Sequence, residues 1–193
     1  MKSYVLFLAI WGSFSSALAI PMDSNQGKVE FLAIGKPAAI KIKGEGKGPT
    51  GQFDLKRSGS DLKLTADLNV DLETLDTGIS LRDRHMKEKY LETGKYKTAI
   101  LKVADARLPA AALAGTGSYT VSGTLMMKGV EKPVDIALQL ENLGESVKAI
   151  SKFKINLADY TIDVPKYAGI TVANDVEVSV ETLTAKSALP ETK

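Results

Sequence analysis

A strict alternation of apolar and polar residues dominates this chain and limits the folds open to it. In the segment DLKLTADLNVDLET, every even position from Leu62 to Leu72 is apolar, and the odd positions between them are polar. Successive side chains of a β-strand point to opposite faces, so this pattern predicts a long strand with one dry face and one wet face. Such strands are typical of antiparallel sheets.

The same pattern recurs along the chain in shorter segments. The eight predicted strands contain residues 29–33, 40–42, 53–55, 62–72, 119–121, 134–140, 153–157 and 176–180. Turn residues separate them at 57–61 and 143–146, and the glycine-rich run 44–48 predicts a further hairpin connection. Strands with one apolar face must close into a barrel or pair as a sandwich, and alternation alone leaves both open.

The alternation of apolar and polar residues stops in the segment TGISLRDRHMKEKYLETG, residues 77–94. It crowds charges together and contains the single histidine of the chain. Ser80 and Asp83 have the spacing of a capping box, and Gly94 is the type of residue that ends helices. The segment therefore predicts an amphipathic helix over about 80–93.

The predicted helix has one narrow apolar stripe. Ile79, Met86 and Tyr90 recur at spacings of seven and four, so the helix is expected to lie on the sheet by one edge. A short second helical turn is predicted over about 108–114, because Pro109 stands near its start.

The N-terminus matches a secretory signal peptide. Lys2 precedes the apolar run YVLFLAIWG, and the sequence Ala17-Leu18-Ala19 fits a cleavage site. We expect cleavage after Ala19 and export, and the pattern leaves a periplasmic and an extracellular destination open. The predicted organisation is a signal peptide over 1–19, a single domain over 20–186 and a flexible tail over 187–193.

Composition limits how the chain can be stabilised and which kinds of partner it can bind. The chain of 193 residues has no cysteine, so packing rather than disulfides must stabilise it. Its formal net charge of +2 is too small to indicate a nucleic-acid partner. The N-terminal apolar run is shorter than a membrane span requires, so no integral membrane protein is expected. A single sequence leaves the homodimer open.

Four segments together carry a family resemblance, namely LDTGISLRDRHMKEKYLET, YTVSGTLMMKGVEKPVDIALQL, FKINLADYTID and NDVEVSVETLTA. In their order along the chain they resemble the YceI family of exported bacterial proteins, over about residues 27–185. The resemblance implies an all-β, eight-stranded antiparallel, lipocalin-like barrel with helices near one end. It also implies an isoprenoid lipid inside the barrel, as in members that hold an isoprenoid quinone or a prenyl diphosphate.

The resemblance extends to three residues of the helix and fails at one position. Arg82, Asp83 and His85 match the R-D-x-H motif of the family. Many members carry an early histidine where this chain has Gly35 and Lys36, so no role of that histidine carries over.

The candidate ligand contacts form two groups. The interior group consists of Leu64, Leu68, Leu138, Leu140, Phe153 and Val178. These side chains either fill a packed core or line a tunnel, and the resemblance favours the tunnel. The mouth group consists of Arg82, Asp83, His85 and Lys87, which would contact a polar or phosphate head.

Signals for catalysis are weak. His85 has no second histidine or cysteine with which to build a zinc site, and the chain has no G-x-S-x-G motif. The run GEGKGPTG lacks the order of a phosphate-binding loop. The sequence therefore predicts non-enzymatic binding, sequestration or transport of an isoprenoid lipid or similar amphiphile, with no required cofactor. The alternative is a packed barrel that acts through its surface or by self-association.

Overall fold

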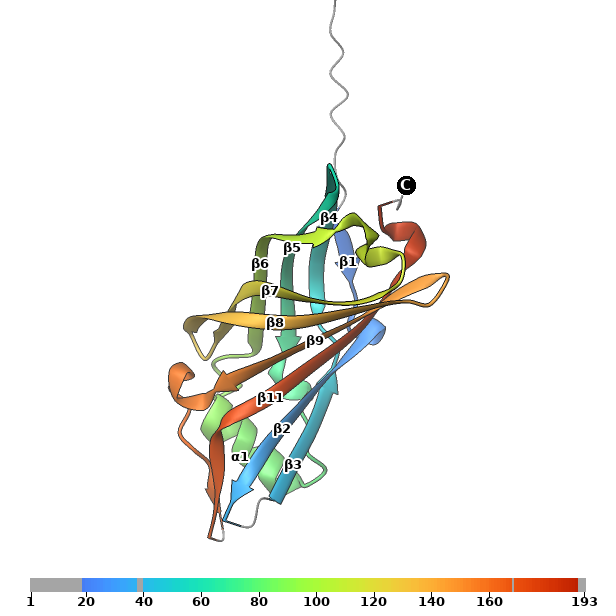
Figure 1. Cartoon of the computed structure of the whole chain (residues 1–193). Coiled ribbons are helices and arrows are strands. Elements are labelled where there is room, and N and C mark those ends of the chain that lie inside the picture. Colours follow the sequence, from blue (N-terminus) through green and yellow to red (C-terminus); the bar gives the residue numbers. More distant parts are fainter. Residues whose placement is uncertain (1–18, 38–39, 168, 191–193) are drawn as a thin grey trace, which may run out of the picture.

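The computed structural model describes residues 19–37, 40–167 and 169–190, and the strands of these residues form one antiparallel sheet (Figure 1). The strands are β1 (Ile20–Met22), β2 (Gly27–Lys36), β3 (Ile40–Lys47), β4 (Thr50–Ser58), β5 (Asp61–Asp71), β6 (Thr98–Pro109), β7 (Thr116–Met127), β8 (Val130–Asn142), β9 (Ser146–Asn156), β10 (Lys166–Tyr167) and β11 (Ile170–Ala185). The helical elements are η1 (Ser24–Gln26), η2 (Leu72–Thr74), α1 (Ser80–His85), η3 (Met86–Leu91), η4 (Ala110–Leu113), η5 (Leu157–Tyr160) and η6 (Lys186–Ala188). The all-β prediction is confirmed.

The strand count differs from the prediction, since the sheet has eleven strands among the described residues instead of eight. All eight predicted strands are present. Strand β6 was missed because its apolar residues run together at 99–101 and its alternation breaks at a bulge near Asp105, whose φ is 52°. Strands β1 and β10, of three and two residues, are too short for a period to be visible.

The sheet curls into a half-barrel instead of closing through a continuous ladder. Its strand order is β1-β4-β5-β6-β7-β8-β9-β11-β2-β3, so β3 is an edge. The segment after β5 covers that edge: Glu45 and Asp76 exchange two backbone hydrogen bonds of 2.8 Å, and the Lys47 N–H donates to Thr74 Oγ1 at 3.2 Å. The seam of the half-barrel is thus closed by a loop, which satisfies the edge without another strand.

Glycines inside β3 explain why the predicted hairpin at 44–48 is wrong. Strand β3 continues to Lys47, and β4, which begins at Thr50, does not pair with it. A Cβ at Gly44 would lie 2.2 Å from the Phe31 ring, and one at Gly46 would lie 2.8 Å from Leu75 Cδ2. These glycines therefore serve close packing against the strand instead of a change of chain direction.

The predicted helix exists, but its ends differ from the prediction. Residues 80–91 are helical, with an α-helical first half and a π-helical second half. Ile79 is the N-cap and makes no side-chain cap, so the Ser80–Asp83 capping box is wrong. The helix ends at Glu92, which adopts the left-handed conformation at φ 52° two residues before Gly94.

One end of the half-barrel is solidly packed. Leu62, Leu108 and Ile136 are each 2% exposed, and η4 plugs this end with Ala112 and Leu113 at 1% and 3%. The Asn142 side-chain amide donates to the Leu113 carbonyl at 3.0 Å and so holds the plug in place. The predicted second helical turn is confirmed as this plug, and it begins at residue 110 because residue 108 still belongs to β6.

The chain ends are only partly described. Residues 1–18 of the predicted signal peptide lie outside the described residues. In the predicted tail, η6 is followed by Leu189, which packs against the core, and residues 191–193 are not described. Among the described helices, none is long and apolar enough to cross a membrane.

Candidate functional site: an apolar pocket beneath the helix

A pocket of about 470 Å³ lies in the other half of the half-barrel, a volume typical of ligand sites. One wall consists of residues from strands β2, β3, β5, β6, β7, β9 and β11, and the segment 72–91 supplies another wall. Most lining side chains are apolar; the polar exceptions are Thr77, Arg82, His85, Tyr90, Ser151, Lys166 and Thr182. The pocket therefore suits the apolar chain of an amphiphile.

The structure divides the six predicted interior residues between two environments. Leu68, Phe153 and Val178 line the pocket. The other three lie in the packed half, where Leu138 and Leu140 are 7% and 6% exposed and Leu64 packs against the same cluster. The interior is thus packed in one half and hollow in the other.

The change from α to π geometry directs the helix side chains at the pocket. His85, Met86, Tyr90 and Leu91 all line it, and these positions are related by a spacing of five. A π-turn, with its i to i+5 hydrogen bonds, keeps such pairs on one face, whereas an α-turn rotates them apart. The sequence showed the Met86 and Tyr90 positions of this face but gave no sign of the wider turn.

A hydrogen-bond network holds the start of the helix. The Arg82 guanidinium donates from Nε to Thr77 Oγ1 at 2.7 Å and from Nη2 to the Thr77 carbonyl at 2.8 Å. The Thr77 N–H and hydroxyl both donate to Asp83 Oδ1. Thr77 therefore orients Arg82, which lines the pocket, while Asp83 does not line it and stabilises the network from behind.

This network favours the charged form of Asp83. Desolvation by partial burial tends to raise the pKa of its carboxyl, but the hydrogen bonds from Thr77 and the charge of Lys87 outweigh it and hold the pKa below its usual value of 3.8. The Asp83 carboxylate accepts its hydrogen bonds from Thr77, so it is engaged within the protein and does not face a ligand.

The two remaining mouth candidates, His85 and Lys87, differ in whether they line the pocket. His85 is half-buried and lines the pocket, and its imidazole makes no hydrogen bond to the described part of the chain. Lys87 does not line the pocket, and its carbonyl accepts a hydrogen bond of 2.9 Å from the Thr93 N–H. Arg82 and His85 are thus the members of the predicted mouth group that face the pocket.

Lys128 fastens the far end of the helix, a contact that no sequence pattern indicated. Its ammonium lies 2.6 Å from Glu92 Oε1 and donates to the Thr161 carbonyl at 3.0 Å. Lys128, Glu92 and Thr161 all have φ between 50° and 53°. One side chain therefore ties three sharp turns together, namely the end of η3, the β7–β8 turn and the end of η5.

The position of the absent histidine is tightly packed. A Cβ at Gly35 would lie 2.7 Å from Ile170 Cγ2 and 3.6 Å from Ile40 Cβ. A side chain there would push β11 and β3 away from β2, so Gly35 fits the close approach of its neighbours.

A second hollow, of about 810 Å³, follows the outer side of β9, β11, β2 and β3. Its charged lining residues carry both signs, as in Lys154 and Glu177, whose side chains lie 3.3 Å apart. Such a surface suits water better than a specific ligand. Among the described residues, no group of three or more histidine or acidic side chains is placed to hold a metal ion.

The fold and pocket define a class, the lipocalin-like half-barrels with an internal apolar cavity. The chain belongs to the YceI family, since the model of the YceI-like domain matches residues 21–183. A UPF0312 protein of Vibrio vulnificus (strain YJ016) is 30% identical over 184 residues, covering 85% of this chain and 91% of the relative. A UPF0312 protein of Vibrio campbellii (strain ATCC BAA-1116) is 27% identical over 186 residues, covering 86% and 92%.

Two solved structures share the fold. A polyisoprenoid binding domain from Saccharophagus degradans, implicated in plant cell wall breakdown, superposes with a TM-score of 0.63 at 21% identity, covering 86% of this chain and 97% of that domain. BcnA of Burkholderia cenocepacia superposes with a TM-score of 0.68 at 19% identity, covering 84% and 99%. At these identities the likeness concerns the fold.

Proposed function

We propose that this protein binds an isoprenoid lipid, or a similar long amphiphile, and sequesters or carries it without catalysis. The observation that carries the proposal is the 470 Å³ pocket with a mostly apolar lining and the basic side chains of Arg82 and His85 on one wall. The polyisoprenoid binding domain of Saccharophagus degradans, which has the same fold, supports the chemical class of ligand. Export, predicted from the N-terminus, would place this carrier outside the cytoplasm.

The tail of the ligand would occupy the apolar part of the pocket. Each methylene group that leaves water for such a lining contributes about 0.8 kcal/mol, before the cost of ordering the chain. Leu68, Phe153 and Val178 belong to this part of the lining. Because most of the lining offers no hydrogen bonds, affinity would follow tail length more than tail chemistry.

The head of the ligand would lie near Arg82. Two of the five guanidinium donors are used on Thr77, which leaves the others for a ligand and fixes the plane of the group. A fixed guanidinium favours planar or phosphate oxygens. His85 lies one helical turn further along the same wall.

Thermal unfolding with paired ligands tests both halves of the proposal. An isoprenoid alcohol and the diphosphate of equal length should both raise Tm, since a ligand at about 100 times its Kd adds about 2.7 kcal/mol to the free energy of unfolding. The diphosphate should shift Tm further, and Arg82→Gln should remove only that difference. Arg84→Gln is the control, because Arg84 is exposed on the same helix and does not line the pocket.

The outcomes are distinct. No shift with either ligand would contradict lipid binding and would favour the packed barrel that acts through its surface. Equal shifts for alcohol and diphosphate would leave the tail site in place and remove Arg82 as the head contact.

A further inference from the structure

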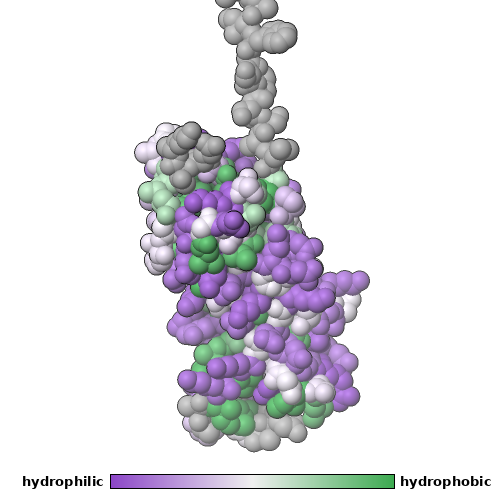
Figure 2. Space-filling model, turned by 90° about the vertical axis from the view of Figure 1, so that its right-hand side faces the viewer, coloured by the Kyte–Doolittle hydropathy of each residue, from purple (hydrophilic) through white to green (hydrophobic). Residues whose placement is uncertain are grey.

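The pocket reaches the surface at a rim of exposed apolar side chains. Ile40, Ile79 and Leu81 line the pocket and are 40%, 52% and 42% exposed. They come from β3 and from the start of the helix, at the lower end of the molecule in Figure 1. Hydrophobic surface is visible at this lower end in Figure 2, and a further group is visible near the upper end.

The apolar rim continues onto β11, the strand on the other side of β2 from β3. Ile170 of β11 also lines the pocket, and Ile40 and Ile170 both lie within 4 Å of the position that a Cβ on Gly35 would take. The rim is therefore a surface shared by two walls of the pocket and not a set of scattered side chains, which is the arrangement expected of a binding surface.

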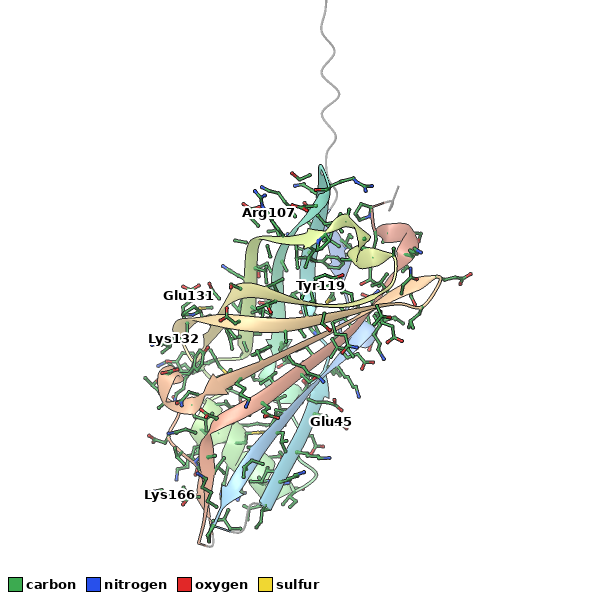
Figure 3. All side chains as sticks on the ribbon, in the orientation of Figure 1. Glu45, Arg107, Tyr119, Glu131, Lys132 and Lys166 are labelled. Carbon is green, nitrogen blue, oxygen red and sulfur yellow. The ribbon has the colours of Figure 1, made fainter. Side chains whose placement is uncertain are left out.

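Lysines surround the same end. Lys36, Lys41 and Lys166 are exposed, and the register of the sheet aligns Lys166 with Thr171 and Thr171 with Lys36. Figure 3 shows Lys166 at the lower tip of the molecule. No ion pair engages these three ammonium groups within the described part of the chain. The exposed carboxylate of Asp163 reduces the positive charge of the tip but does not cancel it.

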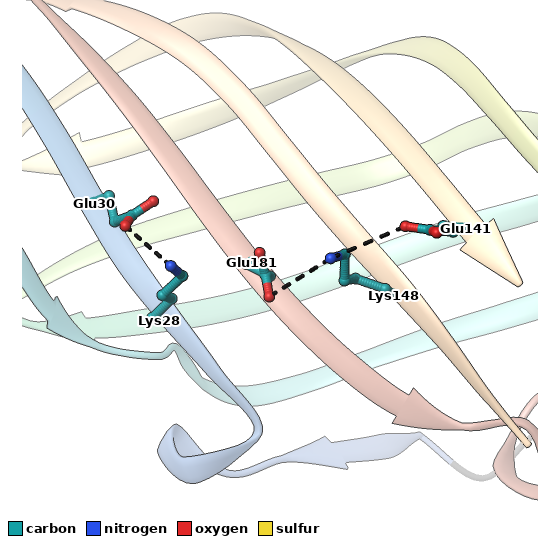
Figure 4. A network of polar contacts seen from close by, with 5 residues as sticks. All are labelled: Lys28, Glu30, Glu141, Lys148 and Glu181. Atoms are coloured by element: carbon teal, nitrogen blue, oxygen red, sulfur yellow. Dashed lines mark hydrogen bonds and ion pairs between the residues drawn. The ribbon is translucent and has the colours of Figure 1, made fainter. Parts of the chain in front are cut away.

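The charges higher on the same sheet behave differently. On β2, Lys28 lies 3.0 Å from Glu30, and on β9, Lys148 lies 4.0 Å from both Glu141 and Glu181 (Figure 4). These two lysines have acidic partners, whereas the three lysines of the tip have none among the described residues. The lysines of the tip stand beside the exposed apolar rim.

We infer that this rim docks on the surface of an anionic lipid bilayer. Ile40, Ile79 and Leu81 would enter the headgroup region, while Lys36, Lys41 and Lys166 would contact lipid phosphates. Apolar side chains with flanking lysines are the combination by which proteins lie on anionic membranes. If the proposed function holds, docking would let a lipid pass between bilayer and pocket without crossing water.

Flotation with vesicles tests the docking. Wild-type protein should bind vesicles of phosphatidylcholine and phosphatidylglycerol, mixed at about 7:3, far better than pure phosphatidylcholine vesicles, with affinity falling as salt rises. Lys36→Gln with Lys41→Gln should weaken binding about 25-fold, since each lysine near an anionic surface contributes about fivefold. Lys102→Gln with Lys152→Gln, at exposed lysines away from the tip, is the control and should change nothing.

A second pair of variants tests the apolar rim. Ile79→Ser with Leu81→Gln should weaken vesicle binding at least tenfold while the protein remains folded, because serine is favourable at the N-cap that Ile79 occupies. Leu143→Ser with Leu183→Ser is matched in exposure, at 50% and 45%, and neither residue lines the pocket. This control pair should bind vesicles like the wild type.

Docking and pocket binding fail separately. Wild-type protein that ignores anionic vesicles, or rim variants that bind like the wild type, would overturn docking and leave the pocket proposal intact. Vesicle binding without any response to a dispersed isoprenoid would overturn the proposed ligand and leave docking in place. A dimer in size-exclusion chromatography that the Ile79→Ser, Leu81→Gln variant dissociates, without vesicle binding, would assign the rim to self-association and also overturn docking.

Discussion

The two halves of this half-barrel are built from the same alternating strands, but one half has a packed interior and the other encloses a pocket. The upper half, closed by η4, buries Leu62, Leu108 and Ile136 almost completely. The lower half, covered by α1 and η3, encloses a pocket, and its rim leaves Ile79 exposed. Alternation thus determines which face of a strand is dry, while the covering element determines whether that dry face packs or encloses space.

The largest effect should come from truncation in the packed half. Ile136→Ala removes three carbon atoms from a site that is 2% exposed, so it should lower the free energy of unfolding by about 2–5 kcal/mol. Ile155→Ala, at a residue that lines the pocket, should cost less because part of its side chain already faces a cavity. Chemical denaturation of both variants measures the difference, and equal losses would contradict the division into two halves.

A larger side chain should also destabilise the packed half more than the half with the pocket. Val121→Phe inserts a ring into the packed cluster, where Val121 is 4% exposed, and should cost about 1–3 kcal/mol. Val178→Phe fills pocket space, so it should cost little stability and abolish binding of an isoprenoid. Thermal unfolding with and without ligand provides both readings; a large stability loss in Val178→Phe would mean that no space exists there.

The start of the helix should respond to pH. The folded pKa of Asp83 lies below its unfolded value, so the unfolded state binds more protons between the two values and stability rises with pH through that window. The contribution is complete above the ordinary value of 3.8 and is lost as pH falls through the folded pKa. Asp83→Asn should therefore have a lower Tm than wild type near neutral pH.

The Tm difference between wild type and Asp83→Asn should shrink in acid, as wild-type Asp83 becomes protonated. A thermal melting series over pH measures it. A difference that stays constant into acid would show that the Asp83 charge does not stabilise the Thr77 network.

The smallest effect should come from the outer face. Lys148 is 29% exposed and lies 4.0 Å from both Glu141 and Glu181. Such exposed pairs typically contribute about 0–1 kcal/mol, so Lys148→Gln should change stability by less than that and leave ligand binding unchanged. A larger loss of stability by chemical denaturation would mean that the ion pairs of the outer face stabilise the sheet more than exposed pairs usually do.

Much of the fold follows from local patterns, and its failures have local causes. The long strand over 62–72 was predictable because its alternation is unbroken. Strand β6 was missed because the bulge near Asp105 shifts the period. Gly44 looked like a turn residue, yet its role depends on Phe31, which reaches it across the sheet from a different strand.

The candidate site was predictable in part for similar reasons. Arg82 and His85 followed from the motif in the helix, and both line the pocket. Leu138 and Leu64 could not be separated from Leu68 by sequence, because alternation assigns a face and not a position along the barrel. Lys128 lies 36 positions from its partner Glu92, and only the fold brings them to 2.6 Å.

Native mass spectrometry after gentle purification from the original host tests lipid binding in the open half most directly. Wild-type protein and Val121→Phe should each carry an added mass that fits an isoprenoid lipid, and Val178→Phe should carry none. A wild-type protein without bound lipid that also takes up none when an isoprenoid is supplied would contradict lipid binding, as would a Val178→Phe variant that retains the lipid of the wild type.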